Sequence, residues 1–351
     1  MMTEVLEVDP RRPAREPIAR AAACLRNGGL VAFPTETVYG LGVHALDAAA
    51  VRRLFDAKGR PSHDPVIVHV ANLDEARVLA SELPAQARSL AERFWPGPLT
   101  LVVRRAASVP PEITAGLETV AVRVPAHPVA HALLVEAGIP IAAPSANLFS
   151  RPSPTIAAHV LDDLEGRIDM VLDAGPTVVG VESTVLDLTR QPPVLLRPGA
   201  VDVEALRAVV PDVEERASAQ GTEQTPLPSP GLLSKHYAPR APLTLYRGPG
   251  PAMRAALIRD AHAALQAGRR VGVLVTHEQA TQLDSIPVVV ADLGSGSSPE
   301  RVASRLYAAL RELDSSGVDM ILAHDFPDDS GLWRAIRDRL RRAASRTIMI
   351  E

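Results

Sequence analysis

The sequence has little cysteine, little lysine and few aromatic residues. Cys24 is the only cysteine in 351 residues, which excludes a disulfide framework and a zinc site built from cysteines. Aromatic residues make up 3 %, too few for the base-stacking surfaces of single-strand-binding proteins. No apolar run is long enough to cross a bilayer, and residues 1–13 lack the apolar stretch of a signal peptide. We therefore expect a cytoplasmic protein with no membrane contact.

Lysine is unusually scarce beside arginine. Only Lys58 and Lys235 occur among the 37 lysine and arginine residues. An ammonium group is a compact point charge that fits against a phosphate oxygen, whereas a guanidinium group is a flat fork. Each lysine is therefore a candidate functional cation, and chance is the alternative explanation.

The remaining composition indicates an ordinary globular protein, with 46 % hydrophobic and 22 % charged residues. The net charge of −4 argues against a protein that coats nucleic acid non-specifically, although it is compatible with a local basic cleft. The length allows two domains, each with a core of its own.

The first 210 residues alternate helical and strand patterns, which predicts a mixed α/β domain. A C-terminal cap signal, Asn27-Gly28-Gly29, ends the first helix. Helices are expected over 18–25, 46–57, 73–79 and 85–94, and strands over 30–33, 65–70, 99–103, 120–124, 139–143, 170–173, 184–188 and 194–196, and residues 205–210 close the domain. The order of the strands in the sheet does not follow from these patterns.

A linker and a second domain follow. Residues 211–241 are polar and rich in turn-forming residues, which is typical of a linker. Within residues 242–351, strands at 243–246, 270–275, 287–291 and 319–323 alternate with helices at 253–266, 299–313 and 331–344. This alternation predicts a small doubly wound parallel sheet, which is a Rossmann-like arrangement.

Polar residues gather where predicted strands of the first domain end. Residues 33–41 place two threonines, a glutamate and a glycine in one turn, and residues 143–147 end another strand with Ser145 and Asn147. Lys58 and Arg60 follow a helix, separated by one glycine. Ligands of α/β sheets bind where strands end and loops begin. These groups predict a polyphosphate held with a metal ion, although each cluster alone also suits a capped turn.

Together these segments resemble the YrdC-type threonylcarbamoyl-AMP synthase family in its longer, two-domain form. The signature pairs are Lys58-x-Arg60 and Ser145-x-Asn147, and the resemblance extends through residues 34–41, 65–69, 182–184, 197–199, 229–231 and 236–239 into the C-terminal domain. It implies a YrdC-like mixed twisted sheet with helices in residues 1–210. It further implies a linker that closes as a lid in 211–241 and a Rossmann-like accessory domain in 242–351.

The resemblance also implies a reaction. L-threonine, bicarbonate and ATP would give L-threonylcarbamoyl-AMP and pyrophosphate, so the enzyme would be a nucleotidyltransferase. A tRNA threonylcarbamoyl transferase would then use the product to form threonylcarbamoyladenosine beside the anticodon. Mg²⁺ would arrive on the ATP phosphates, and neither a resident metal nor a tightly bound cofactor is expected.

The site residues of the family correspond to positions of this sequence. Lys58 and Arg60 are the expected catalytic cations and would hold the ATP triphosphate. The other implied nucleotide contacts are Thr119, Ser145, Asn147, Ser153, Arg197 and Tyr237, and the implied threonine contacts are Thr35, His69, Arg123, Ala143 (through its backbone) and Ser183. The fork of Arg123 suits the threonine carboxylate. Asp64 departs from the family, whose members usually have asparagine there.

Two alternative functions follow from other features. A double-stranded-RNA-binding module is a rival because the catalytic fold resembles one that binds RNA through a basic concavity, but the net charge weighs against it. A carbamoyl-adenylate enzyme of hydrogenase maturation would need zinc-finger cysteines, which the single Cys24 excludes.

The C-terminal domain offers two weaker signals. Residues 294–299 resemble a dinucleotide-binding loop, but the sixth position is proline, so we expect an ordinary loop before a helix. The last helix is basic, and we expect either a solvated face or a weak contact with RNA or the transferase. Its arginines are Arg334, Arg337, Arg339, Arg341 and Arg342.

Overall fold

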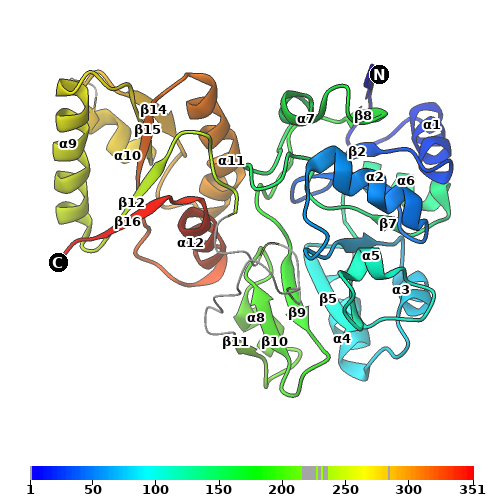
Figure 1. Cartoon of the computed structure of the whole chain (residues 1–351). Helices are drawn as coiled ribbons and strands as arrows, with labels where there is room; N and C mark the ends of the chain where they lie inside the picture. Colours follow the sequence, from blue (N-terminus) through cyan, green and yellow to red (C-terminus); the bar gives the residue numbers. More distant parts are fainter. Residues whose placement is uncertain (1, 216–226, 228–230, 232–235, 284) are drawn as a thin grey trace. The chain divides into compact units, whose positions relative to one another are not determined.

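A computed structural model describes residues 2–215, 227, 231, 236–283 and 285–351. These residues form two compact units (Figure 1). The first unit is drawn from Met1–Phe149 and Ser153–Leu233, and the second from Ser150–Pro152 and Ser234–Glu351. No helix in the described part of the chain is both long and apolar enough to cross a membrane.

A mixed sheet organises the first unit, in the order β1-β8-β2-β3-β7-β4-β6-β5-β9-β10-β11. The strands are β1 (Glu4–Glu7), β2 (Val31–Pro34), β3 (Tyr39–His44), β4 (Ile67–His69), β5 (Leu99–Arg104), β6 (Thr119–Arg123), β7 (Ile141–Ala142), β8 (Met170–Asp173), β9 (Thr184–Asp187), β10 (Val194–Arg197) and β11 (Glu214–Glu215). Parallel pairs such as β4–β6 alternate with antiparallel pairs such as β5–β6. The predicted mixed sheet is therefore confirmed.

Helices cover both faces of this sheet. They are α1 (Arg15–Arg26), α2 (Ala48–Lys58), α3 (Leu73–Leu79), α4 (Ala85–Phe94), α5 (Pro111–Thr114), α6 (Pro128–Ala137), α7 (Ala157–Leu164) and α8 (Val203–Arg207). Val31 and Phe33 of β2 pack with α1 and α6 in one core, whereas Ala32 packs with α2 in the other. Successive side chains of a strand point to opposite faces, so a single strand contributes to both cores.

The predicted turn over residues 33–41 is wrong in its second half. The chain turns at Thr35–Val38, where the backbone N–H of Thr35 donates to Val38 O, and Tyr39 begins β3. The two glycines at positions 40 and 42 made this strand resemble a loop in the sequence, because glycine is uncommon within strands. Gly42 lies against Phe33 and Ile141, where a β-carbon would be 2.8 Å and 2.9 Å from side-chain atoms. Close packing, not turn geometry, therefore accounts for this glycine.

A parallel sheet organises the second unit, in the order β14-β13-β15-β12-β16. Its strands are β12 (Leu243–Arg247), β13 (Val271–Val275), β14 (Val289–Asp292), β15 (Met320–His324) and β16 (Arg346–Met349), and its helices are α9 (Gly250–Gln266), α10 (His277–Ala280), the 3₁₀ helix η1 (Thr281–Leu283), α11 (Pro299–Ser315) and α12 (Gly331–Ala343). The predicted Rossmann-like arrangement is confirmed. The strand β16 and the short helix α10 were not predicted.

We predict that Gly199→Ala destabilises the first unit. A β-carbon at this position would collide with the backbone nitrogen of Thr184 and lie 2.8 Å from Glu182 O, and these backbone atoms cannot move aside cheaply. Overpacking of this kind costs about 1–3 kcal/mol, so thermal unfolding should begin at a lower temperature. Gly250→Ala is the control, because its nearest contact is the flexible side chain of Arg254 at 3.6 Å. Equal unfolding curves for both variants would contradict the prediction.

Candidate active site

Buried hydrogen bonds and an ion pair join the turn between β2 and β3 to Arg123, the last residue of β6. The hydroxyls of Thr35 and Thr37 are 2.8 Å apart, and Arg123 Nη1 donates to Thr37 Oγ1 at 3.0 Å. Arg123 Nη2 lies 2.7 Å from Glu36 Oε1 in an ion pair. Thr35 and Arg123 are each 3 % exposed. The guanidinium fork of Arg123 is therefore held beside two hydroxyls, and its present charged partner is a carboxylate.

His69 lies beside Arg123, because β4 and β6 are parallel neighbours with these two residues in register. It is 3 % exposed, and its ring meets Phe33 edge-on at 6.4 Å between centroids. Burial, with a smaller contribution from the Arg123 charge, lowers the pKa of His69 to about 3. The imidazole is therefore neutral at physiological pH, and Arg123 carries the positive charge of this pair.

Lys58 joins helix α2 to the Ser145–Asn147 loop. Gly59 follows the helix with φ = 61°, a left-handed conformation that turns the chain back on itself. The ammonium group of Lys58, whose residue is only 1 % exposed, donates to Ser145 O at 2.5 Å and also to Asn147 O. The two signature pairs of the sequence therefore meet through this one side chain.

Arg60 lies in a similar environment. Its Nε donates to Asp64 O and its Nη2 to Pro65 O, and Nη2 lies 2.9 Å from the Asp64 carboxylate. Asp64 is completely buried, and burial raises the pKa of its carboxyl group against the opposing effect of Arg60. Arg60 is thus held in place by an acid at the position where the family usually has asparagine.

A third polar group surrounds the start of β9. Ser183 Oγ lies 2.8 Å from Thr100 Oγ1, and Arg197 donates to both the hydroxyl and the backbone oxygen of Ser183. Ser153 Oγ donates to Glu182 Oε1 at 2.5 Å. The predicted residues Ser183 and Arg197 are therefore buried in direct contact. The third, Ser153, is buried against Glu182, the residue that precedes Ser183.

The backbone N–H of Ala143 is already used in a hydrogen bond to strand β4. Its N–H donates to Ile67 O at 2.9 Å, next to the bridge between Gly40 and Ser145. A backbone contact from Ala143 to threonine would therefore come from its carbonyl oxygen. A β-carbon on Gly40 would approach that of Ala143 to 3.3 Å, so the glycine keeps these two segments close.

Thr119 lies at the other end of its strand from Arg123, and Tyr237 belongs to the second unit. Thr119 begins β6 and Arg123 ends it, so the strand separates them by about 13 Å at roughly 3.3 Å per residue. Tyr237 belongs to the second unit, where it is 1 % exposed and packs on Tyr307 and under Arg339. Most of the predicted lid, including Lys235, lies outside the described residues. The roles of both residues stay predictions.

Several partners of the predicted residues are not among the predicted site residues. Glu36 and Thr37 bind Arg123, and Glu182 binds Ser153, although the sequence marks the first two only as part of a turn and the third only as part of a strand end. Their positions directly beside predicted site residues could have identified them. Thr100 lies within an apolar strand, and no local pattern in the sequence indicates its contact with Ser183.

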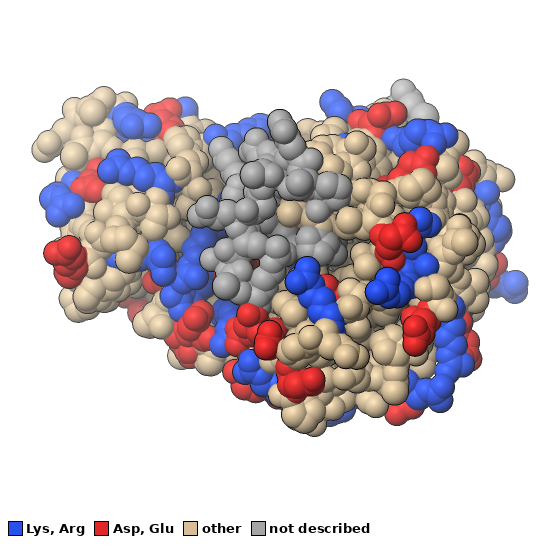
Figure 2. All heavy atoms as spheres, turned by 60° about the horizontal axis from the view of Figure 1, so that its bottom comes forward, with Lys and Arg blue, Asp and Glu red and all other residues tan. Residues whose placement is uncertain are grey.

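The arginines of α12 bind acceptors in their own unit. Arg337 and Arg341 pair with Asp325, and Arg339 and Arg342 pair with Asp338. Figure 2 shows basic and acidic side chains interspersed on each unit. Among the described residues, no group of three or more histidine, cysteine, aspartate or glutamate side chains could hold a metal ion. Contact with RNA and the arrival of magnesium on ATP stay predictions.

Comparison with known proteins covers both units. A family model described as "Telomere recombination" matches residues 23–199, and one described as "Threonylcarbamoyl-AMP synthase, C-terminal domain" matches residues 201–345. The threonylcarbamoyl-AMP synthase of Bacillus subtilis is 48 % identical over 328 residues, which cover 93 % of this chain and 92 % of the relative. That of Pyrococcus abyssi is 44 % identical and covers 94 % of each chain.

Solved structures agree with this assignment. The crystal structure of P. abyssi Sua5 complexed with L-threonine superimposes with a TM-score of 0.92 at 43 % identity, covering 99 % of this chain and 100 % of that one. A doubly substituted variant of the same protein gives a TM-score of 0.92 at 42 % identity, covering 100 % and 99 %. The chain therefore belongs to the threonylcarbamoyl-AMP synthase family of enzymes, in its two-domain form.

Proposed function

We propose that the protein makes L-threonylcarbamoyl-AMP and pyrophosphate from L-threonine, bicarbonate and ATP, in the cytoplasm, for modification of tRNA beside the anticodon. The observation that carries this proposal is the contact of Lys58 with both Ser145 and Asn147. It brings a buried ammonium group and the Ser-x-Asn loop together, as a site for a polyphosphate requires.

The network around Arg123 suits the amino acid. A threonine carboxylate would replace Glu36 as the partner of the guanidinium fork, and the hydroxyls of Thr35 and Thr37 lie at hand for its polar groups. The threonine amine has to lose its proton before it reacts. Because His69 is neutral, it has no acidic proton to give back to that amine. A complex of P. abyssi Sua5 with L-threonine supports the choice of amino acid.

The chemistry requires positioning more than a reactive side chain. Bicarbonate loses hydroxide to give carbon dioxide, the threonine nitrogen attacks its carbon, and the proton released as the carbamate forms joins the hydroxide to give water. A carbamate oxygen then attacks the α-phosphorus of ATP, and the bond to the β-phosphate oxygen breaks to release pyrophosphate. Charge grows on the leaving group, so fixed cations stabilise the transition state. We assign this role to Lys58 and Arg60, with Mg²⁺ brought by the nucleotide.

The other predicted residues complete the proposal. Ser145, Asn147, Ser153 and Arg197 would contact the nucleotide, together with Thr119 and Tyr237. Ser183 and the carbonyl group of Ala143 would contact threonine. The linker in 211–241 would close over both substrates and exclude water from the mixed anhydride. The product would pass to a tRNA threonylcarbamoyl transferase.

Mass spectrometry of the products tests the proposal. The purified chain is incubated with ATP, magnesium, threonine and ¹³C-bicarbonate, and the expected product is threonylcarbamoyl-AMP that carries one ¹³C atom, in equal amount to pyrophosphate. Reactions that lack threonine or bicarbonate are the controls. Pyrophosphate released at the same rate without threonine would contradict the proposal.

We predict that Lys58→Met lowers product formation by about 100-fold or more, because it removes a fixed cation from the transition state. Methionine keeps most of the buried stem, which limits the loss of packing. Arg52→Gln is the matched control, since Arg52 lies on the same helix but forms a surface ion pair with Glu112 and is 61 % exposed. Initial rates are measured at saturating substrates. Similar rates for both variants would remove Lys58 from the mechanism.

We predict that His69 makes the free energy of unfolding fall as the pH is lowered. In the unfolded chain His69 takes up a proton with a pKa of about 6.5, whereas in the folded chain its pKa is about 3. The contribution of His69 to stability is therefore complete above pH 6.5 and is lost as the pH falls toward 3. His69→Gln should show a smaller loss of unfolding free energy over this range, measured by denaturant titration. His131→Gln, at an exposed position on α6, should behave like the wild type.

A further inference from the structure

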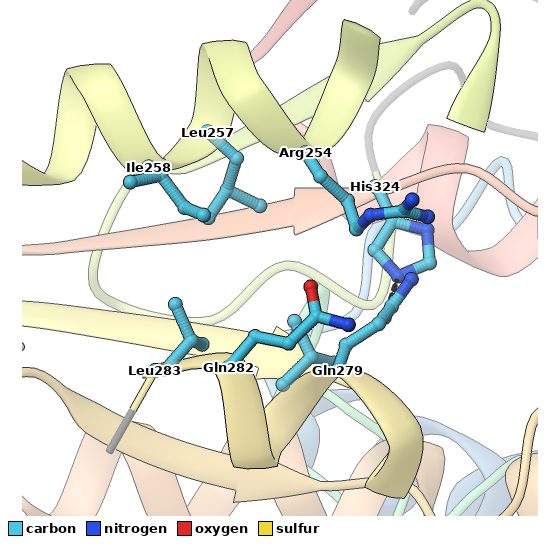
Figure 3. A pocket seen from close by; sticks show the side chains of 8 residues that line it. Arg254, Leu257, Ile258, Gln279, Gln282, Leu283 and His324 are labelled. Atoms are coloured by element: carbon cyan, nitrogen blue, oxygen red, sulfur yellow. Dashed lines mark hydrogen bonds between the residues drawn. The ribbon is translucent and has the colours of Figure 1, made fainter. Parts of the chain in front are cut away.

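The second unit contains a pocket that the proposed reaction does not use. It lies between α9 and the segment α10–η1, beside the ends of β13 and β15 (Figure 3). One end is apolar and is formed by Leu257, Ile258 and Leu283, and the other end carries polar side chains. The polar residues are Arg254, Gln279, Gln282 and His324.

The pocket occupies the position where Rossmann-like sheets bind ligands. Strands β13 and β15 are parallel neighbours, and Val275 and His324 are their last residues. The chain continues from β13 into α10 and from β15 toward α12, and these helices lie on opposite sides of the sheet (Figure 1). Ligands of open α/β sheets bind at such a switch point, outside the carboxyl ends of the strands.

The polar end of the pocket is held rigidly. His324 Nδ1 donates to Asp325 O at 2.9 Å, and its Nε2 lies 2.5 Å from Gln279 Oε1. Gln279 Oε1 also accepts a hydrogen bond from Thr276 N, as part of a capping box at the start of α10. His324 is 7 % exposed. Both ring nitrogens face oxygen atoms, as in an imidazolium ion, yet burial lowers the pKa of His324 against the opposing effect of Asp325, and the Arg254 charge adds a smaller lowering. A negative charge in the pocket would relieve this conflict.

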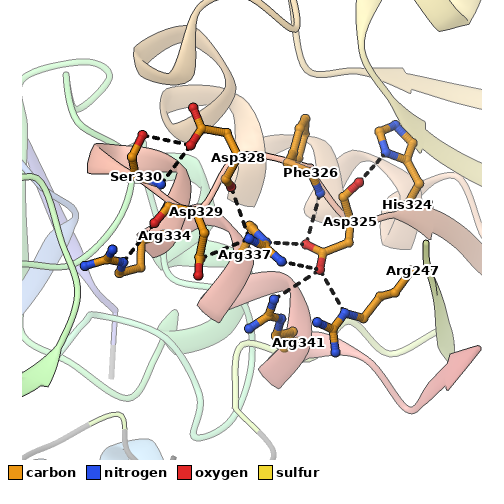
Figure 4. A network of polar contacts seen from close by, with 10 residues as sticks. All are labelled: Arg247, His324, Asp325, Phe326, Asp328, Asp329, Ser330, Arg334, Arg337 and Arg341. Carbon is orange, nitrogen blue, oxygen red and sulfur yellow. Dashed lines mark hydrogen bonds and ion pairs between the residues drawn. The ribbon is translucent and has the colours of Figure 1, made fainter. Parts of the chain in front are cut away.

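Arg254 provides a positive charge for which the described residues offer no acceptor. No hydrogen bond or ion pair joins its side chain to any residue that the structure describes, and Figure 3 shows its guanidinium group beside His324 at the pocket. Asp325 is not available to it in the described structure, because this carboxylate pairs with Arg247, Arg337 and Arg341 (Figure 4). None of the eight lining residues is acidic. The pocket therefore has a mostly apolar lining, with the Arg254 cation beside it.

We propose that this pocket binds a small organic anion, whose carboxylate or phosphate group pairs with Arg254 and whose apolar body packs on Leu257, Ile258 and Leu283. The amide nitrogen of Gln279 is the further donor that the anion would use, since that of Gln282 donates to Glu278 O. A free amino acid fits poorly, because its ammonium group would find no carboxylate among the lining residues. The ligand is thus distinct from the threonine of the proposed reaction.

Calorimetric titration of the full-length protein at constant ionic strength tests this proposal. The probes are butyrate and butyl phosphate, with butyramide as the neutral counterpart. We expect saturable binding of an anionic probe and none of butyramide. The tighter of the two anions identifies the acid group as carboxylate or phosphate.

Two variants locate the binding. Arg254→Gln should weaken it about tenfold or more, as expected for loss of a charge-assisted hydrogen bond. Arg259→Gln should leave it unchanged, because Arg259 lies on the same helix, is 70 % exposed and pairs with Asp260. Unfolding curves show whether both variants are folded. Binding that survives in Arg254→Gln, equal binding of butyramide, or no saturable binding of either anion by the wild type would overturn the proposal.

Discussion

The first unit depends on burying positive charge, which has a large cost unless each cation is bound by oxygen atoms. Lys58, Arg60, Arg123 and Arg197 are each less than 9 % exposed. Backbone carbonyl groups bind all four: those of Ser145 and Asn147 bind Lys58, those of Asp64 and Pro65 bind Arg60, that of Gly97 binds Arg123 and that of Ser183 binds Arg197. The same contacts that stabilise these cations therefore fix the loops at the strand ends. Arg60 and Arg123 also pair with the carboxylates of Asp64 and Glu36, whereas the carbonyl groups that accept from Lys58 carry no net charge and do not compensate its positive charge.

Arg123 and Lys58 differ in what holds them. Arg123 pairs with the carboxylate of Glu36, which a substrate carboxylate can replace by simple exchange. Lys58 donates to two carbonyl oxygens, so a phosphate would have to compete with hydrogen bonds that also position the Ser145–Asn147 loop. Nucleotide binding would then move that loop. Threonine binding would require only that the Glu36 side chain, in the β2–β3 turn, move away from Arg123. The second unit repeats the contrast, since Asp325 binds three arginines while Arg254 binds none among the described residues.

Much of the architecture could be predicted from local patterns. The helices α3 and α4 begin and end as expected, and the alternation after residue 242 correctly indicated a parallel sheet. The strand β3 was missed because its glycines serve packing between distant segments, which a local pattern does not reveal. Helix α6 was missed because most of its residues are apolar, so it lacks the polar face that marks an amphipathic helix. The signature residues were recognisable as motifs, but the partners that bury them, Thr100 above all, come from strands far away in the sequence.

The most direct test of the account is a crystal structure with L-threonine and a non-hydrolysable ATP analogue bound together. The account predicts that the Arg123 guanidinium group leaves Glu36 for the threonine carboxylate, and that Lys58 Nζ lies within hydrogen-bonding distance of a phosphate oxygen. Threonine bound away from Arg123, or a triphosphate beyond the reach of Lys58 and Arg60, would contradict it.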